Sequence, residues 1–454
     1  MRPFFKNDDF NFLTEIALGS VYWQAADVGE VLTTVDRIHD GKARSWVDEW
    51  TATADRLTQL AAASAAAGRA HSAASQYLRG SLYYSLATYS ADGTEDPALF
   101  GSLWEKHRDA WDRFVDLADF GGAAVERIEI PYEGTTLPGY FFRSGPAGTP
   151  RRTLIFNNGS DGSVVGALTG GIADALERGW NAMTFDGPGQ NAALVRQGLA
   201  FRPDWEKVIT PVVDFLSARA DVDGQKLALL GVSQAGYWVP RALAFEHRIA
   251  AAVTDPGVVD VSATILRHLP HTMIKLLEER NRERFNRDVD WTLKISPSTR
   301  SVLALRMRPY GVSTPYEFFS VARDYALTDE LIAQITTPVL VTDPENEQFW
   351  PGQSRELFEK LPREPKAIIA FTQEEGADSH CEPTASGLRG ERIFDWLGEQ
   401  IPALSTSRSN PVYRTDRADS IQPTVPVDRF TAVLRGWARS RESSLTGCVR
   451  TAPG

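Results

Sequence analysis

A serine at the apex of a strand–turn–helix segment constrains this chain more than any other feature. Ser233 lies in the run Leu-Ala-Leu-Leu-Gly-Val-Ser-Gln-Ala-Gly, residues 227–236. The apolar start of this run predicts a short buried strand, and a helix-compatible stretch follows at 237–246. A turn this sharp strains the serine backbone and raises its hydroxyl above the sheet. The small residues Gly231 and Ala235 allow the strand and the helix to pass close to the turn.

Short apolar segments alternate with helical segments on both sides of Ser233. The predicted strands are 125–130, 137–142, 153–157, 181–185, 227–230, 251–254, 339–342 and 366–371. The first two form a hairpin around Gly134, and helical patterns at 165–178 and 205–219 separate later strands. Strands that alternate with helices favour an α/β fold, here with an eight-stranded, mostly parallel sheet that is covered on both faces.

Changes in composition and in hydrophobic periodicity divide the chain into five parts. Aromatic and aliphatic residues between Ser72 and Tyr89 recur at helical spacing, which is typical of a helix with one buried face. Polar and Ser-rich composition marks the last part, where residues 428–439 could form one helix. The expected parts are an N-terminal helical domain (1–124), a first core segment (125–255), a helical lid insertion (256–336), a second core segment (337–404) and a C-terminal tail (405–454).

Composition excludes several classes of protein. Hydrophobic residues make up 43% of the chain and aromatic residues 10%, which indicates a packed globular protein. The net charge of −11 argues against a nucleic-acid partner. No apolar run reaches membrane-spanning length, so we expect no membrane partner. The two cysteines, Cys381 and Cys448, exclude a disulfide framework, and the acidic N-terminal residues do not resemble a signal peptide, so we expect a cytoplasmic protein.

A serine hydroxyl needs a base within reach, and that base needs a carboxylate to fix its tautomer. With a nucleophile on this kind of turn, the acid and then the histidine follow along the chain. Six of the seven histidines lie before the serine, in the helix after it or in the lid: His39, His71, His107, His247, His268 and His271. Only His380 follows the last predicted strand, in the polar loop 374–382. We therefore predict that His380 is the base.

The acid and the oxyanion donors are expected in loops at the carboxyl ends of strands. The loop after strand 339–342 offers three candidates for the acid: Asp343, Glu345 and Glu347. An oxyanion requires backbone N–H donors. We predict one donor at Gln234, directly after the nucleophile, and the other at Ser160, in the loop after strand 153–157.

Several residues near these loops are candidates for substrate contacts. Asp161 could bind a substrate group or only its own loop. Tyr237 and Trp238 follow the nucleophile and favour an aromatic or apolar small-molecule substrate, although packing in the core is the alternative. The same two alternatives apply to the lid aromatics Tyr310, Phe318 and Phe319. Arg143, Arg202 and Arg267 could orient a substrate carboxylate or could serve only as surface or helix-pairing charges.

The chain resembles an α/β-hydrolase family with an N-terminal helical domain. This family includes bacterial 2,6-dihydroxypseudooxynicotine hydrolase and fungal hydrolases that shorten polyketides such as heptaketides. The matching segments are 77–84, 130–135, 137–140, 158–161, 185–190, 202–205, 231–233 and 380–381. The chain departs from the family at Ala235, where glycine is commoner, and at Glu347, where aspartate is commoner.

The resemblance implies an α/β-hydrolase fold, a homodimer and a site without a metal ion or an organic cofactor. In such hydrolases the acid usually lies four residues before a proline. Glu347 and Pro351 have this spacing, so Glu347 is favoured and Asp343 comes second. The resemblance also implies that an N-terminal helical domain packs over the active site.

These features predict a serine hydrolase with a Ser233–Glu347–His380 triad and an acyl-enzyme intermediate. In the related proteins the broken bond can be a carbon–carbon bond of a 1,3-diketone-like or polyketide-type substrate. The sequence leaves open a carboxylesterase or amidase, and an acyltransferase or cyclase in secondary metabolism. A non-catalytic binding protein on a hydrolase scaffold is a third class, which an intact set of serine, acid and histidine disfavours.

Overall fold

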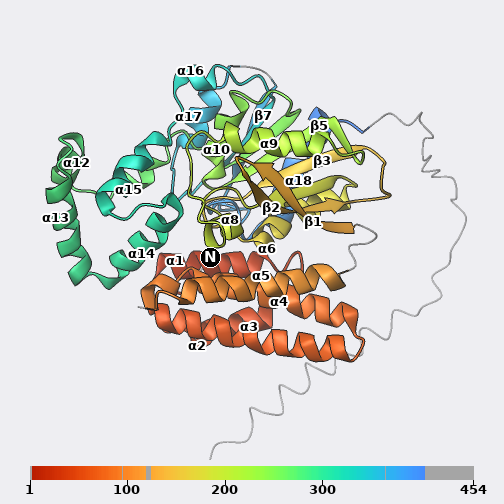
Figure 1. Ribbon diagram of the computed structural model, residues 1–454, viewed down its shortest axis with the longest axis horizontal. Coiled ribbons are helices and arrows are strands. Elements are labelled where there is room, and N and C mark those ends of the chain that lie inside the picture. Colours follow the sequence, from red (N-terminus) through yellow and green to blue (C-terminus); the bar gives the residue numbers. More distant parts are fainter. Residues whose placement is uncertain (1–2, 95, 119–123, 363–364, 404–454) are drawn as a thin grey trace, which may run out of the picture. The chain divides into compact units, whose positions relative to one another are not determined.

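Figure 1 shows the computed structural model, which describes residues 3–94, 96–118, 124–362 and 365–403. The expected tail, 405–454, and its possible helix at 428–439 lie outside the described residues.

A single eight-stranded sheet forms the centre of the described chain. Its strands are β1 (Ala124–Tyr132), β2 (Thr135–Arg143), β3 (Arg151–Asn157), β4 (Asn181–Phe185), β5 (Val222–Val232), β6 (Ala251–Asp255), β7 (Val339–Pro344) and β8 (Lys366–Phe371). Their spatial order is β1-β2-β4-β3-β5-β6-β7-β8. The β1–β2 hairpin and the β2–β4 pair are antiparallel, and every other pair is parallel. This sheet confirms the predicted α/β-hydrolase fold class.

Burial explains why these segments are strands. All five residues of β4 and all five of β6 are buried, as expected for parallel strands that helices cover on both faces. The parallel register aligns Val232, the last residue of β5, with Asp255, the last residue of β6. The carboxyl ends of both strands therefore meet at one edge of the sheet.

Helices surround the sheet and form the N-terminal region. The N-terminal region contains α1 (Asp8–Gly19), α2 (Val28–Arg37), α3 (Ala43–Ala66), α4 (Ala70–Thr88), η1 (Ala91–Thr94) and α5 (Leu99–Leu117). The helices between and after the strands are α6 (Val164–Ala167), η2 (Leu168–Ile172), α7 (Ala173–Glu177), α8 (Asn191–Val195), α9 (Glu206–Ser217), α10 (Ala235–Leu243), α17 (Gln353–Lys360) and α18 (Ser386–Gln400). No helix in the described ranges is both long enough and apolar enough to cross a bilayer.

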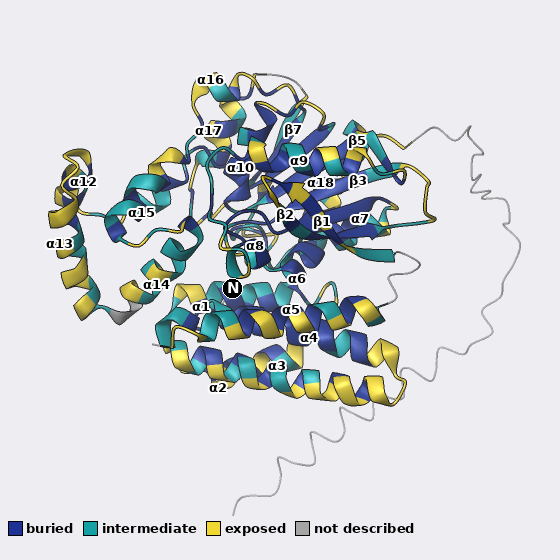
Figure 2. Ribbon diagram, viewed as in Figure 1, coloured by how far each residue is buried: buried dark blue, intermediate teal, exposed yellow. Residues whose placement is uncertain are grey.

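The segment between β6 and β7, which contains the predicted lid and is called the lid segment below, is helical. It contains α11 (Ser262–Leu266), α12 (His271–Glu278), α13 (Arg282–Ile295), α14 (Pro297–Met307), η3 (Arg308–Tyr310), α15 (Pro315–Val321), η4 (Ala322–Asp324) and α16 (Asp329–Ile332). In Figure 2, yellow exposed residues are frequent on α12 and α13, whereas the strands are mostly dark blue. This segment also contacts the N-terminal region, because Arg308 forms an ion pair with Asp92 and stacks 3.9 Å above the ring of Phe100.

One predicted helix differs from the structure. The pattern at 165–178 predicts one continuous α-helix, but the structure has α6, the π-helical turn η2 and α7. Gly170 and Gly171 lie in this turn, and a β-carbon at Gly170 would come within 2.7 Å of the Phe156 ring. Adjacent glycines are weak helix formers, and here they permit close packing on β3.

A buried ion pair joins α5 to the end of β4. The Arg108 guanidinium donates to the Asp186 carboxylate at 2.5 Å and to the Tyr140 hydroxyl at 3.2 Å. Arg108 is 3% exposed and Asp186 is 5% exposed. Burial opposes the charge on Arg108, but Asp186 and Tyr140 outweigh it, so the pKa of Arg108 lies above its ordinary value. The N-terminal region is therefore coupled to the sheet by a desolvated charge pair.

We expect Arg108→Ala to lower the free energy of unfolding by about 3–5 kcal/mol, because it leaves the Asp186 carboxylate buried without its cation. Urea denaturation followed by circular dichroism measures this loss. Arg113→Ala is the matched control on the same helix, where Arg113 pairs with Asp109 at 2.9 Å and its side chain is 53% exposed. Arg113→Ala should lower the free energy of unfolding by about 1 kcal/mol or less. Equal losses in the two variants would contradict a structural role for the buried pair.

Candidate functional site

Ser233 lies on a tight turn between β5 and α10. Its φ of +57° is left-handed, a conformation that L-residues rarely adopt. The Ser233 backbone N–H donates to the Asp255 carbonyl at 2.7 Å, and this bond holds the turn against β6. A β-carbon at Gly231 would lie 2.5 Å from Val239, and one at Gly236 would lie 1.9 Å from the Pro256 carbonyl oxygen. The sequence prediction named Gly231 but missed Gly236, where the approach is closer.

His380 joins the serine to a carboxylate. Its Nε2 lies 2.9 Å from Ser233 Oγ, and its Nδ1 lies 2.8 Å from Glu347 Oε2 and 3.0 Å from Oε1. The side chains of His380 and Glu347 are 4% and 5% exposed. The Gln348 side chain accepts a hydrogen bond from the backbone N–H of His380 at 2.8 Å, which orients the loop. The structure thus brings the predicted serine, acid and histidine into one hydrogen-bonded chain.

Glu347 alone among the three candidate acids contacts His380. Asp343 pairs with Arg355 at 2.8 Å, and Glu345 accepts from the backbone N–H of Gln373 at 2.8 Å. Glu347 Oε1 also accepts backbone N–H bonds from Phe349 at 2.8 Å and Trp350 at 3.1 Å. Burial opposes ionisation of Glu347, but His380 and these two N–H groups outweigh it, so the pKa of Glu347 lies below its ordinary value. The carboxylate is therefore charged at neutral pH.

The two predicted oxyanion donors are Gln234, in the turn that carries Ser233, and Ser160, in the loop after β3. Within the described residues, neither the backbone N–H of Gln234 nor that of Ser160 donates a hydrogen bond to the protein. The loop is close to the nucleophile, because a β-carbon at Gly159 would lie 2.7 Å from Ser233 Cβ. The Gln190 side chain donates to the carbonyls of Asn158 and Gly159 at 2.7 and 2.6 Å and fixes the loop. Both N–H groups are thus available to a ligand.

The structure does not support substrate contacts by Tyr237 and Trp238. Both side chains are fully buried. The Tyr237 hydroxyl donates to the Pro203 carbonyl at 2.9 Å, and Trp238 stacks on Trp205 with the ring centroids 4.0 Å apart. These residues follow the nucleophile in sequence, but α10 turns their side chains into the core under the sheet edge. We therefore assign them to packing.

Asp161 contacts both the lid segment and the N-terminal region. Its carboxylate pairs with Arg306 of α14 at 3.1 Å, and its carbonyl accepts a hydrogen bond from the Tyr89 hydroxyl at 3.0 Å. Arg306 also lies 3.5 Å from the Ser160 hydroxyl. The sequence prediction missed Arg306, because it is one of many lid arginines and no local pattern distinguishes it. Arg267, which the sequence analysis considered as a contact for a substrate carboxylate, donates to the Gln348 carbonyl at 2.8 Å.

The other two considered arginines serve as structural charges. Arg143 pairs with Glu126 at 3.0 Å, and Arg202 pairs with Asp204 at 2.7 Å. Neither contacts the proposed triad. The predicted lid aromatics also pack with one another: the ring centroids of Tyr310 and Phe318 are 5.3 Å apart.

Aromatic rings that the sequence prediction did not identify surround His380. The ring centroid of Phe349 lies 4.6 Å from that of His380, and the centroid of Phe12, on α1, lies 6.0 Å away. Both phenylalanines are partly exposed. A side chain from the first helix of the chain thus lies beside His380, which no local signal in the sequence could reveal.

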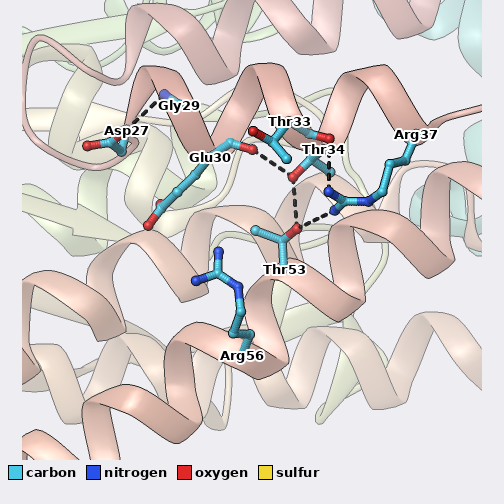
Figure 3. A pocket seen from close by; sticks show the side chains of 8 residues that line it. All are labelled: Asp27, Gly29, Glu30, Thr33, Thr34, Arg37, Thr53 and Arg56. Atoms are coloured by element: carbon cyan, nitrogen blue, oxygen red, sulfur yellow. Dashed lines mark hydrogen bonds between the residues drawn. The ribbon is translucent and has the colours of Figure 1, made fainter.

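Ser233 lines neither of two cavities found in the described residues. One, of about 370 Å³, is lined by the proposed triad acid Glu347 and by Asp343, Glu345, Arg355 and others. The other, of about 320 Å³, lies among residues of α2 and α3 and the Asp27 cap of α2 (Figure 3). Its polar groups bond to one another, as the 2.8 Å contact between the Thr34 and Thr53 hydroxyls shows. The residues that line this second cavity belong to the N-terminal region and do not include Ser233.

Comparison with known proteins shows related hydrolases along nearly the whole described chain. The chain is 30% identical over 416 residues to hydrolase LUC6 from a Fusarium species, covering 88% of this chain and 98% of the relative. It is 30% identical over 429 residues to hydrolase acrC from Aspergillus aculeatus, covering 88% and 98%. It is 31% identical over 413 residues to 20-hydroxy-prefusarin hydrolase FUS2 from Gibberella moniliformis, covering 87% and 97%. No protein-family model matches the chain.

Solved structures show the same fold. The crystal structure of 2,6-dihydroxy-pseudo-oxynicotine hydrolase superposes with a TM-score of 0.66 at 19% identity, covering 85% of this chain and 95% of that chain. AbyA5 superposes with a TM-score of 0.57 at 17% identity, covering 87% and 95%. The predicted resemblance is therefore confirmed. The chain belongs to the α/β-hydrolase family that includes these fungal proteins, and it is a hydrolase of the α/β-hydrolase type.

Proposed function

We propose that this chain is a serine hydrolase in which Ser233 is the nucleophile, His380 the base and Glu347 the acid. One observation carries the proposal: an unbroken hydrogen-bonded chain from Ser233 Oγ through the His380 ring to the Glu347 carboxylate. A neutral serine hydroxyl is a weak nucleophile, and a hydrogen-bonded imidazole that a carboxylate orients makes it reactive. The charged, buried Glu347 also stabilises the imidazolium that forms.

The chemistry follows from this arrangement. Ser233 Oγ attacks a substrate carbonyl carbon while its proton passes to His380 Nε2, and the carbonyl oxygen becomes an oxyanion. The bond to the leaving group then breaks, and the leaving atom takes the proton from His380. Water, deprotonated by His380, attacks the resulting acyl-enzyme and releases a carboxylic acid and the free serine. The N–H groups of Gln234 and Ser160 are the proposed donors to the oxyanion.

We propose a carbon–carbon bond in a 1,3-diketone-like or polyketide-type molecule as the substrate bond. Such a leaving group departs as an enolate, which His380 can protonate on carbon. One relative at 31% identity is named for 20-hydroxy-prefusarin, which supports a secondary-metabolite substrate. The partly exposed rings of Phe12 and Phe349 beside His380 favour an aromatic or apolar acyl portion.

The triad predicts that Ser233→Ala and His380→Ala each reduce kcat by about 10⁴-fold or more. The assay is turnover of a panel that pairs aryl 1,3-diketones with aryl esters, with product analysis. Diketone cleavage lost in both variants supports the carbon–carbon hydrolase. Ester turnover alone would point to a carboxylesterase, and a transferred or cyclised acyl group to an acyltransferase. Activity that survives Ser233→Ala would overturn the covalent mechanism.

The acid assignment predicts different effects of two amide substitutions on neighbouring loop residues. Glu347→Gln should lower kcat by about 10²–10⁴-fold, because a neutral amide no longer fixes the His380 tautomer or stabilises the imidazolium. Asp343→Asn is the matched control, since Asp343 pairs with the exposed Arg355 and not with His380. Its kcat should stay within about threefold of wild type. A larger loss in Asp343→Asn than in Glu347→Gln would reverse the assignment.

The close approach of Gly159 to the nucleophile predicts that Gly159→Ala lowers kcat. The new methyl group would lie 2.7 Å from Ser233 Cβ and 2.9 Å from the Val232 carbonyl oxygen, so the nucleophile or the oxyanion loop must shift. A displacement of this size costs about 100-fold in rate. Gly166→Ala is the control, because its β-carbon would meet only Ser163 Oγ, at an ordinary 3.5 Å. Steady-state kinetics on both variants measures the change in kcat, and circular dichroism checks that both variants are folded.

A further inference from the structure

Two buried carboxyl groups lie on neighbouring segments, because the thiol of Cys381, next to Glu382, donates to the Asp255 carbonyl at 3.1 Å. Asp255 is the last residue of β6, and Glu382 follows His380 by two positions. Neither residue has exposed surface. A hydrogen bond to Asp255 is among the causes that raise the pKa of Glu382. The proposed mechanism uses neither side chain.

Three of the four oxygens of these carboxyl groups lack a hydrogen-bond donor in the described residues. Asp255 Oδ1 accepts a hydrogen bond from the Thr342 hydroxyl at 2.8 Å. Asp255 Oδ2 and both Glu382 oxygens accept no hydrogen bond from any donor in the described residues. Ionised carboxylates are acceptors only, so two of them cannot bond to each other. A contact between buried carboxyl groups is stable when one of them keeps its proton.

The surrounding charges favour a retained proton. Arg389 of α18 is the nearby cation, but its guanidinium donates to the carbonyls of Cys381 at 2.8 Å and Thr169 at 3.2 Å. The Glu347 carboxylate also raises the pKa of Glu382, and burial raises the pKa of the Cys381 thiol. Burial above all, and then Asp255, hold the pKa of Glu382 well above its ordinary value despite Arg389.

The same residues determine where the nucleophile and the base lie. The Asp255 carbonyl accepts both the Ser233 backbone N–H at 2.7 Å and the Cys381 thiol at 3.1 Å. Cys381 and Glu382 have left-handed φ angles of +57° and +44°, so the loop after His380 needs contacts that stabilise this path. A bond from Glu382 to Asp255 is such a contact.

We propose that Glu382 keeps its proton at neutral pH and donates it to Asp255, and that this hydrogen bond positions the His380 loop against the Ser233 turn. Both are positioning residues, since neither touches the reacting atoms. The link to catalysis depends on the proposed triad, whereas the retained proton does not. The proton belongs to the pair, so its loss charges both groups and separates them.

The retained proton is tested by urea unfolding at several pH values in wild type and Glu382→Gln. An acid whose pKa is raised on folding stabilises the protein fully below its ordinary pKa, and this stabilisation is lost as pH rises toward the raised value. The amide of Glu382→Gln donates to Asp255 and has no proton to lose. Between about pH 5.5 and 7.5, we compare the unfolding equilibrium constant of wild type with that of Glu382→Gln. The ratio of the wild-type constant to the variant constant should rise about tenfold for each pH unit.

The control for this slope is Glu374→Gln, the same substitution at an exposed position of the same loop. It should follow the wild-type slope. If wild type and Glu382→Gln have the same slope, the pair holds no extra proton and the proposal is wrong.

The positioning role is tested by the rate at which a serine-directed phosphonate labels Ser233. Glu382→Leu, which cannot donate to Asp255, should label about tenfold more slowly at pH 7, and Glu382→Gln should restore most of the rate. Labelling of Glu382→Leu at the wild-type rate would overturn the positioning role. Wild type that resists labelling at every pH would count against the proposed function alone, because the unfolding slopes still decide whether the proton is retained.

Discussion

The hydrogen bond from the Ser233 backbone N–H to the Asp255 carbonyl is the contact on which the rest of the site depends. Ser233 has a left-handed φ, which costs about 1–3 kcal/mol and persists only where surrounding contacts impose it. The parallel register that aligns Val232 with Asp255 places donor and acceptor together at the carboxyl edge of the sheet. Without this register the serine turn would relax, and the distance to His380 would change.

Segments outside the sheet complete the site. The first helix packs tightly on the loop after His380, because a β-carbon at Gly19 would lie 1.5 Å from the Pro383 carbonyl oxygen. Arg306 of α14 and Tyr89 near the end of α4 both bond to Asp161 in the oxyanion loop. The N-terminal region and the lid segment therefore contact the loops that carry the proposed base and the proposed oxyanion donors. A truncated sheet domain would lose these supports.

Chain order and local pattern were enough to predict the sheet, and they named Ser233 and His380, which the structure places 2.9 Å apart. Local pattern did not reveal where the side chains of Tyr237 and Trp238 pack. Tyr237 and Trp238 adjoin the nucleophile in sequence, yet packing against Trp205 turns one of them into the core and a bond to the Pro203 carbonyl fixes the other. Adjacency along a helix does not determine which face meets the ligand, because tertiary packing sets the rotation of the helix.

The sequence by itself determined the strands, their order along the chain and the residue types that can do acyl chemistry, since these depend on short-range periodicity and side-chain chemistry. Only the tertiary structure decided that Glu347, and not Asp343, reaches His380. It also decided that Asp255 Oδ2 and both Glu382 oxygens are buried without a hydrogen-bond donor in the described residues. Such pairings depend on the path of loops between distant strands, where an ångström separates a hydrogen bond from no contact.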